Sequence, residues 1–101
     1  MKRLEAAIVQ LYKIGARHRR GFKLAELTPE MIANNIIDEA QKLKDEIMCP
    51  LVEIKLRDEA AKDEVADVVA ACVHMAMRLG MSVEQLEQRV LDKLAKRFVV
   101  D

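Results

Sequence analysis

The sequence predicts an all-α fold, arranged as a short bundle of four helices. Apolar residues recur at helical spacing in four separate stretches, and the chain has only three Gly and two Pro residues, so its turns are few. The aromatic residues are Tyr12, Phe22 and Phe98, which leaves a core of aliphatic side chains. Such a core is common in helix–helix packing. The length suits one domain, which we expect to span residues 1–101.

The first two helices have recognisable limits. The first is expected near the N-terminus, ending at Gly15 or Gly21, because apolar residues recur there at helical spacing: Leu4, Ile8, Leu11 and Tyr12. The second is expected to begin after Thr28, whose side chain can cap a helix. Pro29 suits the first helical position, and the helix should run to about Met48.

The second half of the chain predicts two more helices. Residues 51–57 fit either a short helix or an extended connection. A helix is expected over residues 58–79, since Gly80 can supply a left-handed C-cap. The last helix is expected to begin after Ser82, which can form a capping box with Gln85, and to run to about residue 98.

Charge and hydropathy exclude several kinds of partner. Seventeen basic and seventeen acidic residues balance, whereas nucleic-acid-binding domains are usually strongly basic. No run approaches the roughly 20 apolar residues of a membrane span, and the N-terminus lacks the apolar stretch of a signal peptide. We therefore expect a cytoplasmic protein with no nucleic-acid or membrane partner. Cys72, in an apolar run, is expected to be a small buried hydrophobe.

The third predicted helix indicates self-association. Residues 65–77 are apolar nearly all round, with Asp67 and His74 as the exceptions. Such a helix must be covered on several sides, and four short helices in one chain offer too little cover. We expect oligomerisation to complete the bundle, as a homodimer or homotetramer, and His74 to have a structural role.

Acidic residues occupy positions where apolar ones belong. The inward stripe of the second helix reads Ile32, Ile36, Glu39, Leu43 and Glu46. On the third helix Glu64 lies in line with apolar residues, and Asp67 is one turn further on. Oxygen ligands from two packed helices suit Mg²⁺ together with substrate phosphates. The same acids also fit a solvated ladder in which Lys42 pairs with Glu39 or Glu46, and spacing leaves both readings open.

Two basic clusters have a similar double interpretation. The last helix carries cations at helical spacing: Arg89, Lys93, Lys96 and Arg97. This line can hold a polyphosphate, or it can be a solvated face whose late cations offset the helix dipole. The same alternatives apply to the earlier cluster of Arg17, His18, Arg19, Arg20 and Lys23.

Two segments, IIDEAQKL and DEVADVVAACVHMAMRLGMSVEQLEQRVLDKLAKRF, resemble the MazG-like all-α nucleotide pyrophosphohydrolases. The resemblance covers roughly residues 18–98. That family has an acidic pair and a third acid on one helix, E-x-x-D on the next, and a basic last helix. The resemblance implies that Asp38 and Glu39 are the acidic pair and that Glu64 and Asp67 form E-x-x-D.

The resemblance also implies a function. It predicts a Mg²⁺-dependent nucleoside triphosphate pyrophosphohydrolase that releases a nucleoside monophosphate and pyrophosphate, as in the house-cleaning of nucleotides. The expected catalytic and metal-binding residues are Glu39, Glu64 and Asp67, with Asp38 or Glu46 as a further metal ligand. The expected phosphate-binding residues are Lys93, Lys96 and Arg97, with Lys42 as an additional candidate. Members are typically dimers or tetramers with active sites near subunit interfaces.

Lys42 departs from the family pattern, because it occupies the position of the third acid on its helix. We expect its side chain to turn aside and pair with Glu46 or Asp45, which leaves the other acids free to hold Mg²⁺. If the ammonium enters the site instead, the alternative is a non-catalytic helical oligomer of the same fold that binds nucleotides or a protein partner.

Overall fold

The computed structural model describes residues 1–18, 20–50 and 52–98, and these ranges contain four α-helices and no β-strand. This confirms the predicted all-α fold. The elements are α1 (Lys2–Lys13), the 3-10 helix η1 (Leu24–Glu26), α2 (Pro29–Met48), α3 (Ile54–Arg78) and α4 (Val83–Arg97). The helix predicted to end at Gly15 or Gly21 ends earlier, at Lys13, and Gly15 then adopts a left-handed φ of 69°.

Local capping sets the start of α2 and of α4. The Thr28 hydroxyl accepts a hydrogen bond of 3.2 Å from the backbone N–H of Met31, next to Pro29 at the first helical position. At α4 the backbone N–H of Gln85 donates to the Ser82 hydroxyl at 3.1 Å, and the Ser82 N–H donates to the Gln85 side chain at 2.9 Å. Both predicted starts are therefore confirmed.

Helix α3 begins at Ile54, four residues before the predicted start at residue 58. The N–H of Arg57 donates to the carbonyl oxygen of Glu53 at 2.9 Å, which closes the additional turn. The Arg57 guanidinium also donates to the carbonyl oxygen of Ile47 at 3.4 Å and joins the start of α3 to the end of α2. Of the segment that the sequence left ambiguous, residue 51 lies outside the described residues.

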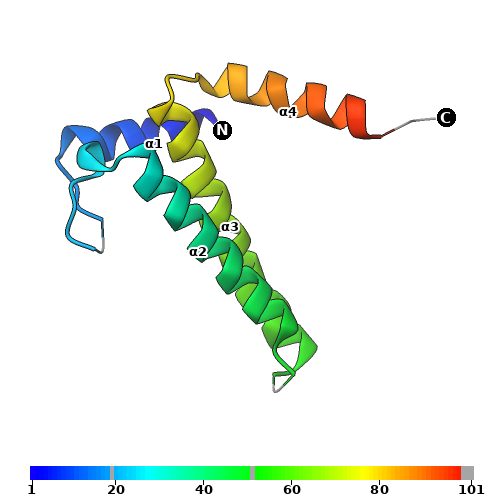
Figure 1. Cartoon of the computed structure of the whole chain (residues 1–101). Coiled ribbons are helices and arrows are strands. Elements are labelled where there is room, and N and C mark those ends of the chain that lie inside the picture. The colour runs from blue at the N-terminus through cyan, green and yellow to red at the C-terminus, as the bar shows by residue number, and fades with distance from the viewer. Residues whose placement is uncertain (19, 51, 99–101) are drawn as a thin grey trace.

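Helices α2 and α3 form a long antiparallel hairpin, and α1 lies across the end at which α2 begins and α3 ends (Figure 1). Most of the buried residues gather at this end, among them Ile8, Leu27, Ile32, Val73, Ala76 and Val83. The Arg78 guanidinium donates to the carbonyl oxygen of Leu27 at 2.8 Å and ties the connection before α2 to the end of α3. The α1–α2–α3 junction is therefore the packed part of the chain.

Helix α4 leaves the end of α3 and points away from the hairpin (Figure 1). The radius of gyration is 15.8 Å, whereas a compact domain of this length has about 13 Å. The chain as described is thus more extended than a packed four-helix unit, because nothing in it lies along most of α4. No single described helix has the length and apolar content of a membrane span; α3 and α4 reach that level only together, across a bend of 115°.

Exposed apolar side chains occur on all four described helices, and those of α3 and α4 bear on self-association. Val65 and Val69 on α3 are 47% and 44% exposed, and neighbouring Cys72 is exposed too. The prediction that Cys72 is buried is therefore wrong for the single chain, since α2 covers only one side of α3. The apolar residues of α4 and its C-cap are also exposed: Val90, Leu91, Leu94 and Phe98. Exposed apolar side chains in this number are typical of an interface. They support the predicted oligomer, which stays a prediction.

Candidate metal centre and adjoining cavities

Three carboxylates meet between α2 and α3. Glu39 comes from α2, Glu64 and Asp67 come from α3, and one oxygen of each lies within 4.8 Å of the others. Glu39 reaches this position because it lies on the inward stripe of α2, seven residues after the fully buried Ile32. Glu64 and Asp67 share one face of α3 because they are three residues apart. The structure thus brings together the three acids that the sequence singled out.

The environment of this acidic cluster disfavours negative charge. One oxygen of Glu39 and one of Glu64, both Oε2, are buried without a hydrogen-bond partner. Desolvation raises the pKa of Glu64, and the negative charges of Asp67 and Glu39 raise it further, while Lys42 acts in the opposite direction. Desolvated carboxylate oxygens that repel one another are the donor set that a hard divalent cation such as Mg²⁺ prefers. The residues present therefore fit a magnesium ion.

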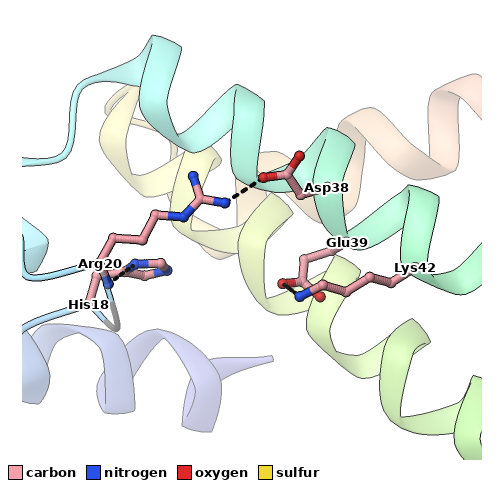
Figure 2. A network of polar contacts seen from close by, with 5 residues as sticks. All are labelled: His18, Arg20, Asp38, Glu39 and Lys42. Carbon is pink, nitrogen blue, oxygen red and sulfur yellow. Dashed lines mark hydrogen bonds and ion pairs between the residues drawn. The ribbon is translucent and has the colours of Figure 1, made fainter.

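Lys42 enters the cluster rather than turning aside. Its Nζ lies 3.3 Å from Oε1 of Glu39 (Figure 2), so the predicted pairing with Glu46 or Asp45 is wrong. Asp45 instead accepts a hydrogen bond of 2.8 Å from Gln41. The physical reason is that several carboxylates attract the ammonium from the Glu39 side, whereas Asp45 offers one exposed charge. The Lys42 side chain is still 57% exposed, so it retains the freedom to move.

The further ligands suggested by the sequence lie elsewhere. The Arg20 guanidinium donates to Oδ2 of Asp38 at 2.6 Å, and Figure 2 shows Asp38 pointing to a different side of α2 from Glu39. Consecutive helical residues are about 100° apart, which explains this divergence. Among the described residues the three-carboxylate group contains neither Asp38 nor Glu46. Asp38 instead anchors the loop between α1 and η1.

A cavity of about 630 Å³ opens beside the acidic cluster. Its lining includes the three acids and Lys42, together with apolar residues of α1 such as Ile8 and Leu11. The loop between α1 and η1 adds Arg17 and Arg20. Phosphates that approach the acids would therefore meet cations from this loop, which belong to the basic cluster that the sequence left open. Arg19 of that cluster lies outside the described residues.

The basic residues of α4 are not brought to this cavity within one chain. Lys93, Lys96 and Arg97 are exposed, and the helix that carries them points away from the hairpin (Figure 1). They do not line the cavity that contains the acids. The predicted phosphate contacts from α4 are therefore not made within the single chain.

His74, for which the sequence predicted a structural role, lies at the wall of the acid-lined cavity. It is only 9% exposed, and its Nε2 has no hydrogen-bond partner. Burial lowers its pKa, and the positive charges of Arg78 and His18 lower it further. His74 interrupts an apolar stretch two helical turns after Asp67, on the same face of α3.

Taken together, the fold and the site define an all-α protein whose helical hairpin carries a candidate divalent-cation centre. The model of the MazG-like family matches residues 31–101, which include all three acids. The chain therefore belongs to the MazG-like family, as the sequence resemblance predicted. Family membership suggests a function of the nucleotide pyrophosphohydrolase type. Searches of curated proteins and of solved structures each found no match.

Proposed function

We propose that this protein is a Mg²⁺-dependent nucleoside triphosphate pyrophosphohydrolase that releases a nucleoside monophosphate and pyrophosphate. The observation that carries the proposal is the convergence of Glu39, Glu64 and Asp67, two of which have a buried oxygen without a partner. Such a cluster does not stabilise the fold, because burying carboxylates without partners costs free energy. A role in binding a cation explains why the cluster is present despite this cost. The expected physiological use is the house-cleaning of nucleotides.

Each acid has a role in this proposal. Glu39, Glu64 and Asp67 would hold the ion, and bound Mg²⁺ would offset the negative charge that builds up on the triphosphate. A carboxylate of the cluster would accept a proton from the attacking water. The water oxygen then bonds to phosphorus, the bridge between the α and β phosphates breaks, and pyrophosphate leaves.

The cations divide into two groups. Arg17 and Arg20 line the same cavity as the acids. They can therefore contact the phosphates of a substrate that is bound by the acids of their own chain. Lys93, Lys96 and Arg97 would reach the triphosphate from a second subunit, in a homodimer or homotetramer. The uncovered apolar residues of α4 support this arrangement, because packing against another copy would remove them from water.

One contact favours a second candidate function. Lys42 places an ammonium 3.3 Å from Glu39, where it can take the place of the metal. A lysine in that position neutralises part of the cluster and can itself bind phosphate. The protein would then be a non-catalytic helical oligomer that binds nucleotides or a protein partner, with a decayed metal site.

The discriminating experiment measures pyrophosphate release from a panel of nucleoside triphosphates, with Mg²⁺ and with a chelator. We expect release that requires Mg²⁺ and is lost in Glu64→Gln, which keeps the shape of the side chain. Glu59→Gln is the matched control, because Glu59 is an exposed acid on the same helix that pairs with Lys62. Nucleotide binding with no pyrophosphate release from any member of the panel would favour the second function.

A further inference from the structure

The described residues of the loop between α1 and η1 hydrogen-bond to one another. The N–H of His18 donates to the carbonyl oxygen of Phe22 at 2.6 Å, and the N–H of Gly21 donates to the carbonyl oxygen of His18 at 2.8 Å. The Arg17 guanidinium donates to the carbonyl oxygen of Gly21 at 3.0 Å. Gly21 permits this geometry because its φ of 90° lies in the left-handed region. These local bonds shape the turn that presents Arg20.

One ion pair joins this turn to α2. The Arg20 guanidinium donates to Oδ2 of Asp38 at 2.6 Å, across 18 residues of sequence (Figure 2). Among the described residues, no other side-chain hydrogen bond links the turn to a helix of the hairpin. The two side chains are 59% and 46% exposed, and ion pairs as exposed as this contribute little to folding stability. The pair is therefore better explained by where it places the guanidinium than by the stability it adds.

The pair lies at the border of the acid-lined cavity. Arg20 lines this cavity together with Glu39, Glu64 and Asp67. Asp38 immediately precedes Glu39 on α2 but points to a different side of the helix (Figure 2). The ion pair thus brings a guanidinium next to the acidic cluster without adding a fourth carboxylate to it.

The Arg20 guanidinium keeps donors for a ligand. Of its side-chain nitrogens, only Nη2 is hydrogen-bonded to the described residues. A guanidinium has five N–H donors in a rigid, planar fork, which matches two oxygens of one phosphate. A carboxylate that holds one edge of the group fixes the direction of the remaining donors, so less freedom is lost when a phosphate binds.

We propose that Asp38 is a positioning residue, which holds the Arg20 guanidinium where it contacts a phosphate of the bound nucleoside triphosphate. The inference rests on the proposed function, because it places the triphosphate in the acid-lined cavity. It gives Asp38 a role that differs from the metal ligand suggested by the sequence. Asp38 touches neither the ion nor the substrate and acts through Arg20.

The test measures binding of an α,β-methylene nucleoside triphosphate, which is not cleaved between the α and β phosphates, to the full chain in the presence of Mg²⁺. We expect Arg20→Gln to weaken binding about tenfold, because a charge-assisted contact is lost. Asp38→Asn should weaken it about fivefold, because the substrate itself must then immobilise Arg20. The double variant should bind no more weakly than Arg20→Gln, and Asp38→Glu should bind more tightly than Asp38→Asn.

Two further readouts separate positioning from metal binding. The affinity for Mg²⁺ without nucleotide should change less than about twofold in Asp38→Asn, since Asp38 lies outside the acidic cluster. In the hydrolysis assay this variant should have a higher KM with little change in kcat. Asp45→Asn is the matched control, because Asp45 is an acid on the same helix that accepts a hydrogen bond from Gln41 and does not line the cavity.

Several results would overturn the inference: independent effects that multiply in the double variant, an unchanged nucleotide affinity in Asp38→Asn, or a loss of Mg²⁺ affinity in that variant. Failure of the hydrolase is distinguishable. A protein that shows the expected non-additive effects on nucleotide binding but releases no pyrophosphate would support the positioning role and refute the hydrolase. Hydrolysis with an unchanged KM in Arg20→Gln and Asp38→Asn would leave the hydrolase and refute the positioning role. No nucleotide binding by the unmodified protein would refute both.

Discussion

Replacing Lys42 with glutamate puts a fourth carboxylate beside the acidic cluster and removes the ammonium that now contacts Glu39. The variant supplies the acid that the family resemblance implies at this position. We expect Lys42→Glu to bind Mg²⁺ more tightly and to hydrolyse nucleotides at least as fast as the unmodified protein. The physical reason is that the substitution changes the local charge by two units at a site that attracts a divalent cation.

The magnitude follows from Coulomb's law. Two unit charges 4 Å apart interact by about 1 kcal/mol in bulk water. The substitution changes the charge at residue 42 by two units and Mg²⁺ carries two charges, so the interaction is about fourfold larger. The Lys42 side chain is 57% exposed, so mobility and salt reduce the effect. We therefore expect at least a tenfold gain in Mg²⁺ affinity, or about 1.4 kcal/mol. The carboxylates at residues 39 and 42 also repel across one helical turn, which costs about 0.5 kcal/mol of stability without metal.

The assay is calorimetric titration with Mg²⁺, paired with pyrophosphate release. Lys62→Glu is the matched control, because Lys62 also pairs with a glutamate three residues earlier but lies outside the cluster. Lys42→Gln separates loss of the ammonium from gain of a ligand. Unchanged Mg²⁺ affinity in Lys42→Glu, together with no pyrophosphate release by the unmodified protein, would refute the hydrolase and leave the binding module.

Four further predictions concern the cluster, the oligomer, α4 and His74. Glu64→Ala should reduce Mg²⁺-dependent pyrophosphate release at least 100-fold. Its melting temperature by circular dichroism should be unchanged or higher, because like-charge repulsion in the cluster decreases. An unfolded variant would contradict this prediction. Light scattering at micromolar concentration should show a dimer or larger species, and a stable folded monomer would refute the interface. Lys96→Ala should raise the KM for nucleotide about tenfold with little change in kcat, and an unchanged KM would remove α4 from the site. Burial lowers the pKa of His74 from 6.5, so the unfolded state takes up a proton first as the pH drops. The free energy of unfolding should therefore fall between pH 6.5 and the lower pKa of the folded state. Urea unfolding at fixed protein concentration should show a smaller dependence of this free energy on pH in His74→Gln.

The helix starts could be predicted wherever the signal is local. Thr28 and Ser82 cap their helices through side chains a few residues away, so the sequence contains the whole interaction. The start of α3 could not be predicted in this way. Its first turn is joined to α2 by the bond from Arg57 to the carbonyl oxygen of Ile47, which depends on the hairpin being formed.

The acidic cluster was predictable because helical periodicity fixes which residues share a face. Glu39 and Glu64 were assigned to inward stripes from spacing alone, and the structure places one oxygen of each in a buried position. The direction of Lys42 was not predictable, since a long side chain reaches Glu39 from one side and Asp45 from the other. The field of the assembled cluster decides between them, and that field exists only after α2 and α3 have packed.

Cys72 gives the uncovered face of α3 an experimental handle. Its thiol is exposed in the single chain and lies one turn from Val69 and Val68, within the surface that we expect a second subunit to cover. If that surface is an interface, the rate at which Cys72 is alkylated should fall as protein concentration rises, because only dissociated chains present the thiol. The alkylation rate of Cys72 thus reports on assembly through a native residue, without an engineered cysteine.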